Sequence, residues 1–131
     1  RDVLLGGLGP DVLLAGDGND RAYGGIGTDV IHGGDGNDRV YGQRGADMVR
    51  GGAGDDRVYG GASDDTLRGG PGEDELFGGA GSDRAFGNGG DDIVNSTDGV
   101  VDLSQGGDGY DICNVDDIDT VRLCEEITAV S

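Results

Sequence analysis

The chain has 131 residues, enough for one domain, and its formal net charge is −18. Only 34% of the residues are hydrophobic and 5% aromatic, whereas 31 are glycine. Burial of so little apolar surface does not fold a chain on its own, and the acidic groups repel one another. A divalent cation would offset both problems. The basic residues are all arginine and form no basic patch, which argues against a nucleic-acid partner, and no apolar run is long enough to span a membrane.

Residues 6–95 consist of ten consecutive nine-residue units without insertion or deletion. The unit 33–41, GGDGNDRVY, shows the pattern: Gly at places one, two and four, Asp at place six and an apolar residue at place eight. The departures at the glycine places are Ala15, Gln43, Ser63 and Asn88. A fixed period of this kind predicts a repeat architecture in which neighbouring units stack on one another.

Within each unit we expect places one to six to form a loop and places seven to nine a short strand. Tight turns need positive φ, which Gly adopts at low cost. The strand places alternate out, in, out, so the eighth residue packs inside, and such short strands become stable only when stacked about 4.8 Å apart. The eighth-place residues are Leu13, Ala22, Ile31, Val40, Val49, Val58, Leu67, Leu76, Ala85 and Val94.

Two units make one coil of 18 residues. The sequence therefore predicts an all-β fold over residues 1–95, a right-handed parallel β-roll, or β-solenoid. A true 18-residue period at the fifth place supports this prediction. One edge carries Asn19, Asn37, Asp55, Glu73 and Asp91, and the other Pro10, Thr28, Ala46, Asp64 and Ser82. We predict stronger metal sites on the edge that is richer in oxygen-bearing side chains.

The unit GGxGxDxUx, in which U is apolar, resembles the hemolysin-type calcium-binding repeat of the RTX family. The resemblance covers residues 2–95 and one further unit at 106–111. It implies that calcium lies between successive loops on the same edge, held by sixth-place carboxylates and backbone carbonyls. Calcium accepts such a mixture of six to eight oxygens, whereas zinc and copper lack ligands in repeats that contain one His and no Cys. The ten units place five loops on each edge, and five loops leave four gaps. The two edges together therefore imply about eight calcium ions.

By this resemblance the carboxylate ligands on one edge, here called the Asp20 edge, are Asp20, Asp38, Asp56, Asp74 and Asp92. Those on the other, the Asp11 edge, are Asp11, Asp29, Asp47, Asp65 and Asp83. The carbonyl ligands are those of Gly7, Gly9, Gly16, Gly18, Gly25, Gly27, Gly34, Gly36, Gly52, Gly54, Gly70 and Gly72, with Asn19 and Asn37 as further donors. Gln43, Arg44 and Ser63 depart from the pattern, so occupancy beside their loops is left open.

The repeat phase breaks after Asn95, where residues 96–105 shift the register by one before a further unit at 106–114. We expect residues 96–131 to cap the open end of the roll with a small β-hairpin around 116–119, because an uncapped edge exposes unpaired backbone groups. Cys113 and Cys124 flank the expected hairpin turn. We expect a disulfide rather than two free thiols, in agreement with an extracellular setting.

Two outward-facing rows repeat every 18 residues: Arg21, Arg39 and Arg57, and Tyr23, Tyr41, Tyr59 and Phe77. Such rows are typical either of a strip that binds sugars or anions or of a self-stacking aromatic ladder in which Arg offsets nearby acid. The second interpretation is favoured. His32 faces outward, and we expect it to be a surface residue.

No nucleophile stands beside a His, so no catalytic site is predicted. The leading hypothesis is a secreted, monomeric calcium-binding module that folds when calcium binds and serves a larger extracellular protein as a spacer or folding nucleus. Arg1 begins in mid-repeat, so we expect a longer chain with any export signal elsewhere. The alternatives are an adhesin or glycan-binding module that uses the outer rows, and an accessory module of a secreted protease, lipase or epimerase.

Overall fold

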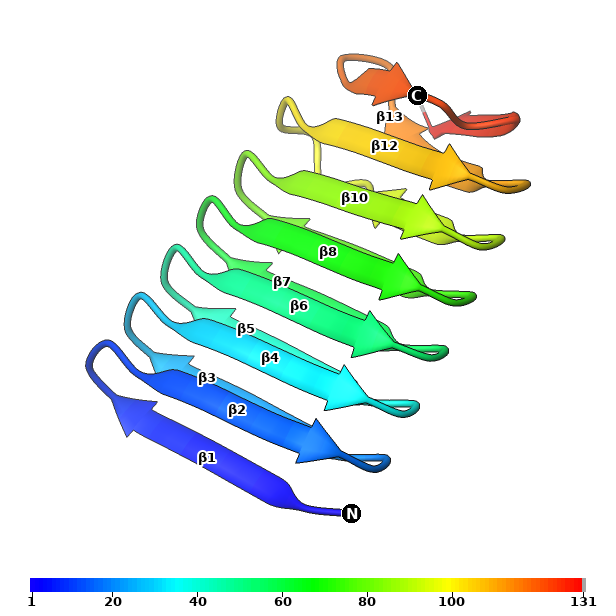
Figure 1. Cartoon of the computed structure of the whole chain (residues 1–131). Helices are drawn as coiled ribbons and strands as arrows, with labels where there is room; N and C mark the ends of the chain where they lie inside the picture. The colour runs from blue at the N-terminus through cyan, green and yellow to red at the C-terminus, as the bar shows by residue number, and fades with distance from the viewer. Residues whose placement is uncertain (131) are drawn as a thin grey trace.

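The computed structural model describes residues 1–130, which form fifteen strands and contain no helix, hence none that could cross a membrane. The strands are β1 (Val3–Leu8), β2 (Val12–Asp17), β3 (Arg21–Ile26), β4 (Val30–Asp35), β5 (Arg39–Arg44), β6 (Met48–Ala53), β7 (Arg57–Ala62), β8 (Thr66–Pro71), β9 (Glu75–Ala80), β10 (Arg84–Gly89), β11 (Ile93–Ser96), β12 (Leu103–Asp108), β13 (Ile112–Asp116), β14 (Thr120–Arg122) and β15 (Glu126–Val130). Odd-numbered strands form an eight-stranded sheet and even-numbered strands a seven-stranded sheet. Figure 1 shows the chain passing from one sheet to the other as a flattened coil.

Every strand pairs in parallel with the strand one coil away. In the repeat region the partners stand 18 residues apart, so Ala22 pairs with Val40 and Ile31 with Val49. This register confirms the predicted parallel β-solenoid with two nine-residue units per coil. It also places every repeat position directly beside its equivalent in the next coil. Side chains at equivalent positions therefore form rows along the axis of the roll.

The strands are longer than predicted. Strand β3 covers places seven to nine of one unit and continues through the first three places of the next, ending at Ile26. Only places four to six remain as a turn, so the prediction of a six-residue loop and a three-residue strand is wrong. The glycines at the start of each unit stay in the sheet because a parallel ladder requires backbone groups and not side chains. Gly25, although its φ is +114°, is still paired with Gln43.

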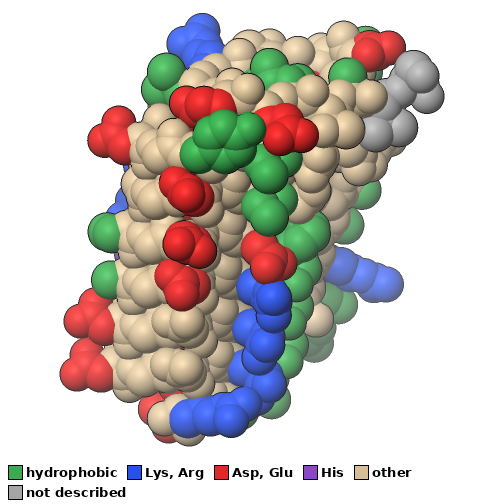
Figure 2. Space-filling model, turned by 90° about the vertical axis from the view of Figure 1, so that its right-hand side faces the viewer, with side chains coloured by type: hydrophobic (Ala, Val, Ile, Leu, Met, Phe, Trp, Pro, Cys, Tyr) green, Lys and Arg blue, Asp and Glu red, His purple; other side chains and the backbone are tan. Residues whose placement is uncertain are grey.

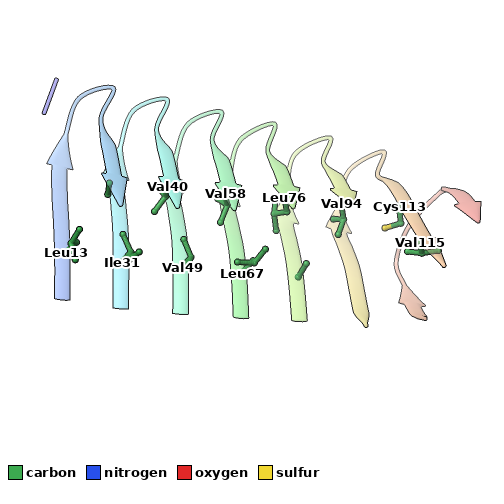
Figure 3. Packing of buried hydrophobic residues seen from close by; sticks show 12 residues of the cluster. Leu13, Ile31, Val40, Val49, Val58, Leu67, Leu76, Val94, Cys113 and Val115 are labelled. Carbon is green, nitrogen blue, oxygen red and sulfur yellow. The ribbon is translucent and has the colours of Figure 1, made fainter. Parts of the chain in front are cut away.

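The core is a narrow file of apolar side chains between the two sheets, made of two facing rows, one from each sheet, as Figure 3 shows. All ten eighth-place residues are buried, and Cys113 and Val115 extend the file into the last coils. Each side chain packs against its equivalents in the preceding and following coils. The predicted burial of the eighth-place residues is thereby confirmed.

The C-terminal segment continues the solenoid. Arg84 pairs with Leu103, 19 residues on, which confirms the one-residue shift after Asn95. The next steps shorten, because Leu103 pairs with Thr120 and Cys113 with Ile127. Strand β14 is parallel to β12, and β15 is parallel to β13. The expected β-hairpin is therefore wrong: each short strand pairs with the open sheet edge of the preceding coil instead of with its neighbour in sequence.

A disulfide joins Cys113 to Cys124, with the Cα atoms 6.0 Å apart, as predicted. Cys113 lies in the buried file, and Cys124 packs against that file from the last loop. The bond closes the loop that contains β14. It therefore fastens the shortened final coil to the core.

Three residues at glycine places adopt a backbone conformation that disfavours side chains. Gln43, Ser63 and Asn88 have φ values of 85°, 89° and 86°. Asn tolerates positive φ better than most residues, whereas Gln and Ser carry the full steric penalty. The backbone is therefore strained at both Gln43 and Ser63.

We predict that Gln43→Gly and Ser63→Gly each raise the free energy of unfolding of the folded roll by roughly 0.5–1 kcal/mol, because glycine removes the clash at positive φ. Asn88→Gly serves as the matched control and should change stability less. Denaturant-induced unfolding, followed by circular dichroism in calcium, measures all three variants. A loss of stability in both Gln43→Gly and Ser63→Gly would contradict the assignment of strain.

Candidate metal centre

The sixth-place aspartates lie at the ends of the turns, just before the strand that follows. Nine of the ten predicted carboxylate ligands, from Asp20 to Asp92, are at most 3% exposed, and Asp11 in the first coil is half-buried. The sheet register stacks them in two rows, one along each edge of the roll. Ionised carboxylates are seldom buried without a partner, so each of them requires an interaction that stabilises its charge.

One oxygen of each carboxylate from Asp20 onward has such an interaction. The backbone N–H of Asp20 donates to Oδ1 of Asp38 over 2.7 Å, and the N–H of Asp29 donates to Oδ1 of Asp47 over 2.8 Å. The same bond recurs along both edges, always from one coil to the carboxylate of the next. A hydrogen bond to a charged acceptor is stronger than a neutral one. The carboxylates therefore join successive coils to each other at both edges.

The second oxygen, Oδ2, is buried and accepts no hydrogen bond. This holds for Asp11, Asp20, Asp29, Asp38, Asp47, Asp56, Asp65, Asp74, Asp83, Asp92, Asp102 and Asp111. An unsatisfied buried acceptor is unfavourable and uncommon in folded proteins, and charge increases the penalty. Twelve such oxygens in two regular rows indicate that a ligand of opposite charge is part of the folded state.

First-place glycines stand beside ten of these twelve oxygens, and Ala15 and Thr97 hold that place before Asp20 and Asp102. A Cβ atom on Gly24 would lie 2.5 Å from Oδ2 of Asp29 and 2.7 Å from the carbonyl oxygen of Gly42. Only glycine fits there, so a carboxylate oxygen and a carbonyl oxygen of the following coil border the same small space. This close approach explains why Gly fills the first place in nine of the ten units.

Carbonyls of the second- and fourth-place glycines also point toward the next coil. A Cβ atom on Gly34 or Gly36 would collide with the carbonyl oxygen of Gly16 or Gly18, one coil earlier. The same relation holds along both edges of the repeat region. The structure thus directs the carbonyls that sequence analysis predicted as ligands into the gaps between successive turns.

The donor set fits a hard cation bound largely by the main chain. Within residues 1–130, no three His, Cys, Asp or Glu side chains converge closely enough to hold a metal by themselves. A site here must therefore combine few carboxylate oxygens with several carbonyls. Calcium accepts that mixture in flexible geometry, whereas a zinc site would need nitrogen or sulfur ligands.

Asn19 and Asn37 lie outside these rows. Both are exposed, and each Oδ1 accepts a backbone N–H from the next coil, from Asn37 and Asp55 respectively, over 3.2 Å. These bonds form an outer ladder along the Asp20 edge. Their role as metal ligands stays a prediction.

Two residues of the carboxylate rows were missed by sequence reasoning. Oδ1 of Asp102 accepts the N–H of Asp83 over 2.7 Å, Oδ1 of Asp111 accepts that of Asp92 over 2.9 Å, and both Oδ2 atoms are unpartnered. Asp111 could have been found, because it holds the sixth place of GGDGYDICN. Asp102 stands nine residues earlier, but the glycines around it are missing and only this spacing identifies it.

The rows end at a different pair of residues. Asp119 accepts the N–H of Asp102 with Oδ1 and that of Asp116 with Oδ2, so neither of its oxygens is left free. Glu125 takes the equivalent place on the other edge and accepts the N–H of Asp111 with Oε2. These two carboxylates complete the final coils without the buried, unpartnered oxygen that marks the earlier turns.

The repeat matches a family model described as the RTX calcium-binding nonapeptide repeat (four copies). The matches cover residues 1–31, 14–49, 23–58, 32–67, 41–76 and 68–100. The chain belongs to this RTX family. Proteins of the family bind calcium, and the buried carboxylate rows fit that cation. A search of curated proteins finds no match to the chain.

Burial raises the pKa of the carboxyl groups in the middle of the RTX roll. The pKa of Asp56, Asp65 and Asp92 is about 7, and that of Asp74, Asp83 and Asp102 is about 6. Loss of solvation is the main cause. The backbone N–H donated to each carboxylate lowers the pKa in part, while neighbouring carboxylates raise it. Without a bound cation, the fold therefore favours protonation of these groups.

This rise in pKa predicts that acid stabilises the calcium-free roll. Between about pH 4 and pH 7 the folded chain holds protons that an unfolded Asp, with a pKa of 3.8, has already lost. In chelator, the stability and β content should therefore rise as the pH falls from about 8 to about 5. Circular dichroism at each pH measures this change.

Calcium should reverse the sign of the pH effect, because protons compete with the cation for the same oxygens. The calcium concentration at which half of the chain is folded should therefore rise as the pH falls over the same range. Pairing the two titrations gives an internal control. Stability in chelator that did not change with pH would contradict the prediction.

Proposed function

We propose that this RTX roll is a calcium-dependent folding module whose compact state forms when calcium fills the gaps between turns. The twelve buried, unpartnered carboxylate oxygens carry the proposal. In the absence of a cation they stack as like charges away from water, which opposes folding. Binding free energy at sites that exist only in the folded chain becomes folding free energy.

Each calcium would be held between two successive turns of one edge. Its ligands would be sixth-place carboxylate oxygens, such as Oδ2 of Asp38, together with second- and fourth-place carbonyls, such as those of Gly34 and Gly36. Calcium supplies the positive charge that these oxygens lack. Six such carboxylates on each edge leave five intervals per edge. We therefore propose about ten sites, rather than the eight that the repeats alone imply.

The module would act outside the cell. A disulfide persists in an oxidising compartment, and the bond between Cys113 and Cys124 fastens the last coil. Calcium near millimolar concentration, as found in extracellular fluid, fills sites of modest affinity. The proposed role is a non-catalytic, monomeric spacer or folding nucleus in a larger secreted protein. It would stay unfolded where calcium is scarce.

The aromatic row favours a structural role for the outer face. Tyr23, Tyr41, Tyr59 and Phe77 stack with ring centroids 4.7–4.8 Å apart and planes within 7° of parallel. Each ring face is covered by its neighbour, so the ladder stabilises strand pairing and leaves little ring surface for sugars. The expected self-stacking ladder is thereby confirmed. The adhesin alternative then depends on the arginine row.

The first prediction is that the chain in chelator at neutral pH is largely unfolded and converts cooperatively to β structure as calcium is added. The cause is the removal of buried like charge by the cation. Far-UV circular dichroism measures the conversion. Magnesium is the matched control and should act poorly, because it demands octahedral geometry and retains its waters. A chain that is equally folded in chelator and calcium would refute the proposal.

The second prediction concerns the number of sites. The double variant Asp102→Asn/Asp111→Asn should bind about two fewer calcium ions than the wild type, because each substitution weakens one inter-turn site. Equilibrium dialysis against radioactive calcium gives the count. Asp108→Asn, at an exposed position of the same region, is the control and should bind as many as the wild type. An unchanged count in the double variant would restrict the sites to the repeats.

A further inference from the structure

A groove of about 340 Å³ runs along the Asp20 edge. Arginines of the seventh-place row form one wall, and fifth-place residues, beginning with Asn19 and Asn37, form the other. Buried sixth-place carboxylates lie between the two walls. Figure 2 shows this side of the molecule, with a column of basic side chains and, in the neighbouring column, acidic side chains that lie mostly farther along the axis. All twelve residues that line the groove are polar or charged.

The arginine wall brings like charges together. Arg21, Arg39 and Arg57 stand directly opposite one another on adjacent strands, and like charges in that position are destabilising. Arg57 is compensated by Glu75, with two hydrogen bonds of 3.0 and 3.1 Å. Within the described part of the chain, Arg21 and Arg39 have no carboxylate partner. Two neighbouring guanidinium groups are therefore available to an external anion.

The opposite wall changes in character along the axis. Beside Arg21 and Arg39 it consists of the amides of Asn19 and Asn37, which are exposed and uncharged. Farther along, the wall becomes acidic with Asp55 and Glu73. A ligand that fits the whole groove must place anionic groups at the arginine end. It must also offer hydroxyl donors to the carboxylates at the other end.

The lining also excludes other classes of polymer. No apolar side chain lines the groove, so a peptide would find no pocket for a hydrophobic anchor. The rings of the neighbouring aromatic ladder cover one another, so nucleobases would find few faces on which to stack. A chain of sugars that bear both carboxylates and hydroxyls matches the remaining requirements.

We infer that this groove binds an extended acidic polysaccharide, with sugar carboxylates on Arg21 and Arg39 and sugar hydroxyls on the facing amides and acids. Arg can hold a carboxylate through two parallel N–H donors. The inference rests on the proposed calcium-bound state. Cations beside Asp20 and Asp38 would offset the charge at the base of the groove, which otherwise repels an anionic ligand.

The test compares two double variants that remove the same charge from opposite sheets. Arg21→Gln/Arg39→Gln alters the groove, whereas Arg50→Gln/Arg68→Gln alters the outer face of the even-numbered sheet, where those two arginines also stand opposite each other. Isothermal titration calorimetry with a short oligogalacturonate, in calcium and physiological salt, measures binding. The first variant should bind at least about fivefold more weakly than the wild type, and the second within about twofold.

Separate readouts distinguish the failure of this inference from that of the proposed function. Circular dichroism in calcium reports folding of all three proteins, and a neutral maltooligosaccharide of equal length should not bind. Folded wild-type protein that ignores oligogalacturonate overturns the inference alone. An equal loss in both double variants would reveal diffuse charge attraction instead of a site. Equal or tighter binding of an oligothymidylate would overturn the ligand class.

Discussion

The sixth-place carboxylate is the group on which the rest of the roll depends. One of its oxygens accepts the backbone N–H of the preceding coil, as Asp38 does from Asp20, and the other is buried without a partner. The first oxygen aligns neighbouring coils. The second makes that alignment unfavourable until a cation is present. Glycine at the first place follows from the same requirement, because a side chain there would fill the space beside the carboxylate.

The apolar core alone does not account for the fold. Each nine-residue unit contributes one small or medium apolar side chain, from Leu13 through Val94, to the file between the sheets. That is little burial against the conformational entropy of nine ordered residues. Backbone pairing, the aromatic ladder on one face and the metal sites at both edges must provide the remainder. The two kinds of interaction lie in different places: apolar contacts lie in the centre of the roll, and electrostatic contacts lie at the turns.

Periodicity explains why much of this structure could be predicted. The regular spacing of Asp and of apolar residues was enough to predict the coil length, the buried file and the two carboxylate rows. The extent of the strands was misjudged because glycines such as Gly24 and Gly25 signal turns, although a parallel ladder can include them. The hairpin was misjudged because two short alternating runs look the same whether they pair with each other or with the coil below. Asp102 was missed because the glycines of the repeat are absent at their usual places before it. The groove beside Arg39 was missed because it forms only when residues of successive coils stack into rows.

The carboxylate ladder also gives the roll a direction. Every sixth-place N–H receives its acceptor from the coil that follows, as Asp56 receives it from Asp74 and Asp111 from Glu125. A coil is therefore complete only after the next stretch of chain has arrived. Asp119 and Glu125 accept the N–H groups of Asp102 and Asp111, the last donors of the two rows. The polarity of one repeated hydrogen bond therefore makes the two ends of the roll different: the C-terminal end must supply acceptors, whereas the N-terminal end must supply donors.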